Sequence, residues 1–251
     1  VDHGKSTMVG RLLHDTNSLP DGKFEEVQRL CKLKGIDMEY AYILDALTEE
    51  QEQNITIDIA HIYFKTEKRE YAIIDAPGHR EFVKNMITGA SQAEAAVLIV
   101  DAKEGVQEQT RRHAYILSML GLRNPIVVMN KMDLIGYSEE RYNKVCDELR
   151  AFLAKISITP REIVPISARS GEHLQHSSEN MEWYQGHTLI QALDAIEKKG
   201  EKKGAFRMPV QDVYKIDGKR IIAGRVESGR IKVGDDIIVL PTGEKTTVKS
   251  I

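Results

Sequence analysis

Apolar runs that suit strands alternate along most of the chain with segments that suit helices, and this alternation limits the fold more than any other feature. Four of the five runs show little alternation, which is typical of strands in a parallel sheet with helices on both faces. Strands are expected at residues 57–64, 71–74, 95–100, 126–129 and 163–166. Helices are expected at residues 5–14, 109–120, 138–155 and 188–198. The pattern predicts an α/β domain with a doubly wound, mostly parallel sheet, in which residues 57–64 form an edge.

The sequence changes character after the last expected helix. Residues 197–204, EKKGEKKG, contain no apolar side chain, which is typical of a solvated linker. Beyond them, short alternating runs are separated by turn signals such as Asp217-Gly218 and Thr242-Gly243, which indicates the start of an antiparallel β-barrel. We therefore expect a first domain at 1–198, a linker at 199–206 and a barrel domain at 207–251. About 45 residues are too few to close a barrel, so the barrel domain is expected to be incomplete.

Composition excludes some classes of function. The chain has 35 basic and 38 acidic residues, so no global positive field favours nucleic acid or an anionic membrane. Cys31 and Cys146 lie far apart without a Cys/His cluster, which predicts reduced thiols of a cytoplasmic protein. The longest apolar run, residues 95–100, is too short to cross a bilayer, so no membrane association is expected.

The first chemical motif lies at the very beginning of the chain. Gly4-Lys5-Ser6 matches the end of the phosphate loop G-x-x-x-x-G-K-[ST], directly before an expected helix. There, backbone N–H groups and the helix N-terminus would face phosphates, Lys5 would reach the outer ones and Ser6 would ligate Mg²⁺. A surface turn that caps a helix would give the same three residues. Because the motif lacks its first glycine, we expect the first domain to lack its first strand.

Three further motifs follow expected strands. In Asp75-Ala-Pro-Gly78, the aspartate carboxylate could hold Mg²⁺, and the glycine N–H could bond the outermost phosphate. The alternative is that these residues form a plain strand-to-turn junction without a ligand. Asn130-Lys-Met-Asp133 suits guanine, because a carboxylate accepts from the ring N–H and the exocyclic amine, which adenine lacks. Ser167-Ala168-Arg169 would offer a backbone N–H to the guanine oxygen. All stand in order at the carboxyl ends of strands, where open α/β sheets gather ligands. Asn130 and Asp133 disfavour an ATP-using kinase with the same phosphate loop.

These motifs carry a resemblance. Val1-Asp-His-Gly-Lys-Ser-Thr7, Ile55-Thr-Ile-Asp58, Asp75-Ala-Pro-Gly-His79 and Asn130-Lys-Met-Asp133 resemble the G motifs of translation-factor GTPases, and the likeness extends to Pro209-Val-Gln-Asp-Val-Tyr214. It implies GTP or GDP as ligand, with Mg²⁺ as cofactor. The implied GTP-binding residues are Asp2, His3, Gly4, Lys5, Ser6, Thr7, Asp75, Gly78, Asn130, Lys131, Asp133, Ser167, Ala168 and Arg169.

The resemblance also implies roles around the reacting phosphate. The metal ligands would be Ser6, Thr56 and Asp75, with Thr56 closing over Mg²⁺ when GTP is bound. His79 would be the catalytic residue that orients the attacking water. Members usually carry Arg-Gly before Ile-Thr-Ile, whereas Gln53-Asn54 stands there in this chain.

Two branches of the superfamily fit the remaining sequence. Residues 10–16, 63–69, 105–113 and 137–141 resemble the GTPase subunit of sulfate adenylyltransferase, whose partner is a catalytic subunit that makes adenylyl sulfate from ATP and sulfate. Residues 80–88 and 180–184 resemble elongation factors 1-alpha and Tu, whose partners are aminoacyl-tRNA and the ribosome. We expect the sulfate branch, with the elongation factor as the alternative. No catalytic arginine is identifiable in the sequence, so either partner is expected to accelerate a slow intrinsic hydrolysis.

Overall fold

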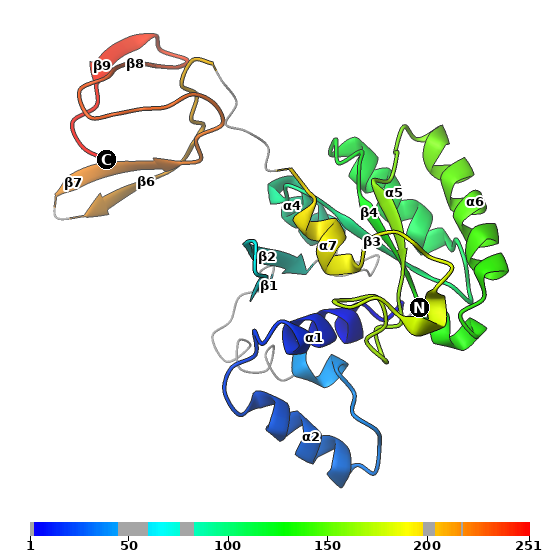
Figure 1. The fold of residues 1–251 in the computed structure, drawn as a ribbon. Coiled ribbons are helices and arrows are strands. Elements are labelled where there is room, and N and C mark those ends of the chain that lie inside the picture. Colours follow the sequence, from blue (N-terminus) through cyan, green and yellow to red (C-terminus); the bar gives the residue numbers. More distant parts are fainter. Residues whose placement is uncertain (1–2, 45–59, 76–82, 198–203, 217) are drawn as a thin grey trace. The chain divides into compact units, whose positions relative to one another are not determined.

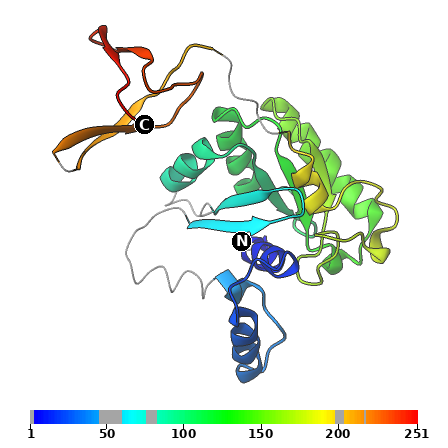
Figure 2. The ribbon, with the colours of Figure 1, turned by 60° about the vertical axis from the view of Figure 1, so that its left-hand side comes forward.

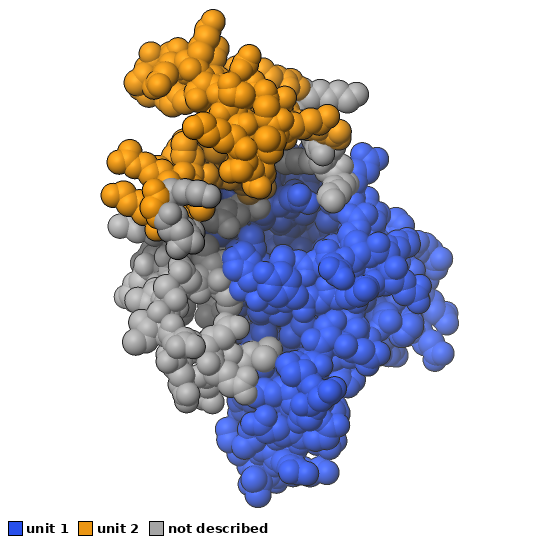
Figure 3. All heavy atoms as spheres, turned by 90° about the vertical axis from the view of Figure 1, so that its left-hand side faces the viewer, with its two compact units in different colours: residues 1–197 blue, residues 198–251 orange. Residues whose placement is uncertain are grey.

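The structure is a computed structural model, and it describes residues 3–44, 60–75, 83–197, 204–216 and 218–251. The chain divides into two compact units, which Figure 3 distinguishes by colour: unit 1 is Val1–Glu197 and unit 2 is Lys198–Ile251.

The centre of unit 1 is a parallel sheet of three strands. These are β3 (Val97–Asp101), β4 (Ile126–Asn130) and β5 (Glu162–Pro165), in the order β3-β4-β5. The register places Val97 opposite Ile126, and Ile126 opposite Glu162. Every residue of β4 is buried, which explains why this strand is a continuous apolar run up to its last residue. The prediction of an α/β fold with a parallel sheet is confirmed.

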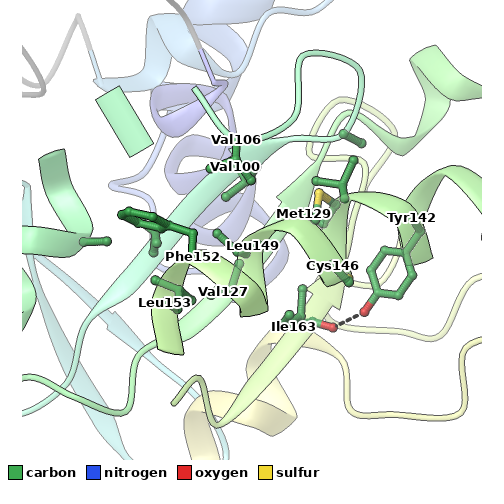
Figure 4. Packing of buried hydrophobic residues seen from close by; sticks show 14 of the residues in the cluster. Val100, Val106, Val127, Met129, Tyr142, Cys146, Leu149, Phe152, Leu153 and Ile163 are labelled. Atoms are coloured by element: carbon green, nitrogen blue, oxygen red, sulfur yellow. Dashed lines mark hydrogen bonds between the residues drawn. The ribbon is translucent and has the colours of Figure 1, made fainter. Parts of the chain in front are cut away.

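Helices cover both faces of this sheet, so unit 1 has two hydrophobic cores (Figure 1). On one face, Val127 and Met129 pack with α5 (Glu108–Met119) and α6 (Glu139–Lys155). Figure 4 shows this core, in which the Tyr142 hydroxyl donates a hydrogen bond of 2.5 Å to the Ile163 carbonyl. On the other face, the alternate β4 residues Ile126 and Val128 belong to a second cluster, to which three further helices contribute. These are α1 (Lys5–Asp15), α2 (Lys23–Leu33) and α7 (Leu189–Asp194).

A second, smaller sheet lies beside α1 (Figure 2). Strands β1 (Ala60–Lys65) and β2 (Glu70–Asp75) form an antiparallel hairpin whose Phe64 belongs to the same core as α1. The open end of this hairpin is Asp75, one of the predicted site residues. Residues 57–59 of the expected first strand lie outside the described residues.

The turn end of this hairpin is bonded to the end of α7. The Asp194 carboxylate accepts hydrogen bonds from the Tyr71 hydroxyl at 2.5 Å and the Thr66 hydroxyl at 2.9 Å. The Arg69 guanidinium donates to the carbonyls of Asp194 and Ile196 at 3.1 and 2.8 Å. Helix α7 ends at Asp194, so its expected continuation through residues 195–197 was wrong, and residue 198 lies outside the described residues. The contact occupies the Asp194 carbonyl, which a longer helix would bond itself.

Several helices were not expected from the sequence. They are α2, α4 (Val83–Gln92), and the short 3₁₀ helices η2 (Met132–Ile135) and η3 (Glu179–Met181). Helix α2 begins after Gly22 without a side-chain N-cap, so the usual start signal is missing. Within the described ranges, the helices are all too short or too polar to span a membrane.

Unit 2 consists of antiparallel hairpins. Strand β6 (Val210–Ile216) pairs with β7 (Lys219–Gly224), and β8 (Asp236–Val239) pairs with β9 (Glu244–Thr247). An isolated bridge joins Arg207 and Ser228. Among its described residues none is buried. The antiparallel strands agree with the expectation, but the described part of unit 2 forms two separate ribbons rather than a closed barrel.

Candidate nucleotide site

The start of α1 forms one end of the site. Gly4 precedes the helix with φ +78°, the left-handed region that favours glycine. A Cβ on Gly4 would lie 2.5 Å from Asn130 Nδ2, so the close approach also requires glycine. The half-buried Ser6 and Thr7 occupy the first turn, which contains no acidic residue. An uncompensated helix N-terminus of this kind attracts anions such as phosphate.

Lys5 and Asp75 meet at this end of the site. The ammonium of Lys5, on α1, lies 2.5 Å from Asp75 Oδ1, at the end of β2. Their side chains keep 39% and 24% of their surface exposed. The structure therefore brings together the lysine predicted for the phosphates and the carboxylate predicted for the metal.

Asn130 connects three predicted motifs. It is the last residue of β4 and is 1% exposed. Its Nδ2 donates to the His3 carbonyl at 2.9 Å, and its Oδ1 accepts from the Ala168 N–H at 3.0 Å. One amide thus holds the phosphate loop and the loop after β5 at fixed positions on either side of the strand end.

The predicted guanine-binding groups lie together at the other end. The Ser167 hydroxyl donates to Asp133 Oδ1 at 2.7 Å, and the Ser170 hydroxyl lies 2.7 Å from Ser167 Oγ. The Gly171 N–H donates to the Ser167 carbonyl at 2.8 Å, which closes the loop tightly. We call residues 167–172 the base loop. Asp133 itself is half-buried, so its carboxylate stands at the surface of a preformed frame.

Lys131 is held by a residue that the sequence reasoning missed. Its ammonium lies 2.9 Å from Asp101 Oδ2, and the Asp101 side chain is only 3% exposed. Asp101 Oδ1 accepts the N–H groups of Lys103 and Glu104 at 2.8 and 3.0 Å. Burial opposes ionisation of Asp101, but the hydrogen bonds from Lys131 and from these N–H groups outweigh it and lower its pKa. Its position directly after an apolar run was the available signal, as for Asp75.

His3 contributes its backbone rather than its ring. Its carbonyl accepts the Asn130 bond, while its buried Nε2 has no hydrogen-bond partner within the described part of the chain. Burial lowers the pKa of this imidazole, so the ring is neutral at pH 7.

The remaining predicted residues divide into two groups. Arg169 is exposed, and its guanidinium pairs with Asp37 at 3.1 Å instead of turning toward Asp133. Asp2, Thr56, Gly78 and His79 lie outside the described residues, as do Gln53 and Asn54. No cluster of three or more His, Cys, Asp or Glu side chains suited to a metal occurs in the described ranges.

The chain matches a known protein family over most of its length. The family described as the elongation factor Tu GTP binding domain matches residues 1–199. The chain belongs to this family. It is thus a GTP-binding protein, as the frame around Asn130 and Asp133 led us to expect.

The similar proteins of this family are translation factors. The chain is 47% identical to elongation factor 1-alpha of Pyrococcus furiosus over 248 residues, 96% of this chain and 56% of that protein. It is 47% identical to elongation factor 1-alpha of Thermoplasma acidophilum over 259 residues, which span the whole chain and 61% of that protein. The chain thus spans little more than half the length of these relatives.

Two solved structures give the same result. One is sup35 complexed with GDP, with a TM-score of 0.56 and 28% identity over 99% of this chain and 55% of that one. The other is a bacterial selenocysteine-specific elongation factor, with a TM-score of 0.55 and 30% identity over 98% of this chain and 36% of that one. None of these four proteins is a sulfate adenylyltransferase subunit. The preference for the sulfate branch finds no support here, and the elongation-factor alternative is favoured.

Proposed function

We propose that this chain is the GTP-binding and GTP-hydrolysing part of a cytoplasmic elongation factor that delivers aminoacyl-tRNA to the ribosome. The observation that supports this most is its 47% identity to elongation factor 1-alpha across 96% of the chain. Identity at this level extends beyond the nucleotide motifs into both units.

The site residues would divide the nucleotide between them. Gly4, Lys5 and the N-terminus of α1 would bind the phosphates, and Asp133 would accept from the guanine ring N–H and amine. The Ala168 N–H, which Asn130 holds at 3.0 Å, would turn to the guanine oxygen. These contacts favour GTP over ATP, because adenine offers neither the ring N–H nor the oxygen.

The oxygen donors near Lys5 fit a magnesium ion. The Ser6 hydroxyl on the first turn of α1 and the Asp75 carboxylate beside Lys5 are hard ligands of the kind that Mg²⁺ prefers. Together with Thr56 they would hold the ion, which neutralises phosphate charge when it is bound. Lys5 and Asp75 bind each other in this structure, so a bound triphosphate would compete with Asp75 for Lys5.

Hydrolysis would depend on positioned water. His79 would orient the water for in-line attack on the γ-phosphate, and backbone N–H groups with Lys5 would absorb the developing charge. Without an identifiable arginine in the chain, turnover would be slow until a partner such as the ribosome stimulates it.

Protection of aminoacyl-tRNA tests this function directly. The purified protein in its GTP form should slow the spontaneous deacylation of aminoacyl-tRNA, while the GDP form should not. Ribosomes should also accelerate its GTP hydrolysis. Equal deacylation in the presence of both nucleotide forms would contradict the proposal and leave GTP binding untouched.

The sulfate branch is the second candidate, because residues 10–16, 63–69, 105–113 and 137–141 resemble it. These segments lie on α1, at the turn of the β1–β2 hairpin, and at the starts of α5 and α6. All four lie outside the nucleotide motifs, where the branches are free to differ. If this candidate is right, a sulfurylase subunit turning over ATP and sulfate should stimulate GTP hydrolysis, and ribosomes should have no effect.

A further inference from the structure

Arg11 connects α1 to the base loop. It lies in the second turn of the helix, and its Nη1 donates to the Arg169 carbonyl at 3.3 Å. Arg169 directly follows Ala168, whose N–H is the group proposed to bind the guanine oxygen. The same helix therefore carries Lys5, which is proposed to bind the phosphates, at its start and a contact to the base loop six residues later.

Two neighbours fix the Arg11 guanidinium. Its Nε donates to Asp15 Oδ1 and Oδ2 at 2.8 and 3.0 Å, and its Cζ lies 4.9 Å from the centre of the Tyr40 ring. The side chain is only 20% exposed. A planar guanidinium held by a carboxylate and an aromatic ring loses little further freedom when it bonds a carbonyl.

The base loop is shaped around this guanidinium. Gly171 has φ +82°, and a Cβ there would lie 2.2 Å from Arg11 Nη2 and 2.4 Å from Cζ. Only a glycine lets the loop approach Arg11 so closely. Helix α1 and the base loop thus fit closely, although Arg11 and Arg169 are 158 residues apart in the sequence.

We propose that Arg11 is a positioning residue for the guanine base. Arg11 holds the main chain of Arg169 and Gly171 in place. It thereby sets the distance between the Ala168 N–H and the phosphate loop to the one that a guanine nucleotide requires. The inference rests on the proposed guanine site and is independent of the choice between ribosome and sulfurylase as partner. It predicts a selective loss: weaker binding of the base with unchanged binding of the phosphates.

The first test compares two probes, GDP and inorganic pyrophosphate, on the Arg11→Ala variant of the protein. The dissociation rate of GDP should rise about tenfold, because the variant loses one charge-assisted hydrogen bond and one cation–π contact. Pyrophosphate affinity, measured by calorimetry, should stay unchanged. Arg11→Lys keeps a cation for Asp15 without the planar fork, and should fall between the wild type and Arg11→Ala.

A matched control separates this role from general stability. Arg112 on α5 forms an (i, i+4) pair with Glu108 as Arg11 does with Asp15, and Arg112→Ala should leave GDP release unchanged. Wild-type GDP release by Arg11→Ala, or an equal loss of GDP and pyrophosphate, would overturn the proposal. If the wild type itself binds pyrophosphate but not GDP, the proposed guanine site fails first.

A second test does not remove Arg11. Gly171→Ala should push the guanidinium away and speed GDP release, while Gly121→Ala, at a similar φ of +76° with open space around it, should not. In the Arg11→Ala background the added methyl group meets no guanidinium, so Gly171→Ala should cause a smaller further change. Strictly additive effects would show that Gly171 acts without Arg11 and would contradict the proposal.

Discussion

The two ends of the nucleotide site are built on different principles. At the base end, Asn130, Ser167 and Ala168 are at most 2% exposed, and hydrogen bonds join Asn130 to Ala168 and Ser167 to the half-buried Asp133 carboxylate. At the phosphate end, two partly exposed charges, Lys5 and Asp75, bind each other. A buried hydrogen-bonded frame keeps its shape, whereas a partly exposed ion pair is weak and is easily exchanged. At the base end a nucleotide would therefore require only the exchange of the Ala168–Asn130 bond within a fixed frame, whereas at the phosphate end it would compete with Asp75 for Lys5.

The largest expected effect lies at the base end. Asp133→Asn replaces one carboxylate oxygen by an NH2 donor, so the hydrogen bond from the guanine amine is lost, and the bond from the ring N–H to the remaining oxygen is no longer charge-assisted. At about 1.5 kcal/mol for each of these two changes, GTP affinity should fall about 100-fold. Xanthosine triphosphate, which presents an acceptor there, should gain affinity. Calorimetric titration of both nucleotides measures this, and Asp147→Asn on the exposed face of α6 is the control. Unchanged GTP affinity would refute the assigned role.

The next effect concerns the buried charge behind the base end. Asp101→Asn leaves the Lys131 ammonium without its carboxylate and should lower the free energy of unfolding by about 2 kcal/mol at pH 7, less than for a fully buried pair because Lys131 is partly exposed. The folded-state pKa of Asp101 is lowered from 3.8, so the wild type keeps this stabilisation above pH 3.8 and loses it as the pH falls below that value.

Urea unfolding at several pH values checks the prediction for Asp101. The difference between the wild type and Asp101→Asn should be the same at pH 7 and pH 5, and should shrink only below pH 3.8. A difference that already disappears near pH 6 would point to a histidine instead.

At the phosphate end we expect a smaller effect on nucleotide affinity, and this effect is a gain. Asp75→Asn removes the internal competitor for Lys5, so GDP should bind about two- to fivefold more tightly in the presence of EDTA, the value of one exposed ion pair. The gain of affinity that Mg²⁺ gives the wild type should disappear in the variant. Fluorescence titration with and without Mg²⁺ distinguishes the two effects. If Asp75→Asn weakens binding in EDTA as well, the ion pair does not oppose the nucleotide.

An effect of similar size tests how rigid the base end is. Ser167→Ala removes the hydroxyl that holds Asp133 Oδ1, and GTP affinity should fall about fivefold, the value of one hydrogen bond of about 1 kcal/mol. Ser170→Ala removes only the outer, exposed hydroxyl of this chain of bonds and should change the affinity less. If the two variants have equal effects, Asp133 does not depend on Ser167 for its position.

Much of this arrangement was predictable from the sequence, for one physical reason. Strands covered on both faces must be apolar along their length, so a polar residue such as Asn130 at the end of a run marks the edge of the sheet where ligands bind. The same reasoning located Asp75 and Ser167. Their roles toward GTP remain predictions, as do those of Thr56 and His79.

The features that the sequence did not reveal depend on tertiary contacts between distant residues. Helix α7 stops at Asp194, where Arg69, more than a hundred residues earlier, bonds the Asp194 carbonyl and the Ile196 carbonyl beyond the helix. Arg11 looks like an ordinary exposed helix residue until the base loop is seen against it. Asp101 lies outside every motif, and only the folded structure shows its pairing with Lys131. Local patterns cannot report partners that are this distant in the chain.

The Asn130 amide bonds residues that are far from it in the sequence, and this affects the order of folding. Its bond to His3 joins positions 127 residues apart, and its bond to Ala168 requires the base loop as well. Contacts so distant in sequence form only when the intervening chain is already compact. A nascent chain therefore cannot hold a guanine nucleotide until unit 1 is nearly complete, so GTP does not guide its early folding. The nucleotide instead stabilises only the finished unit by mass action, so a chain that retains it has completed the folding of unit 1.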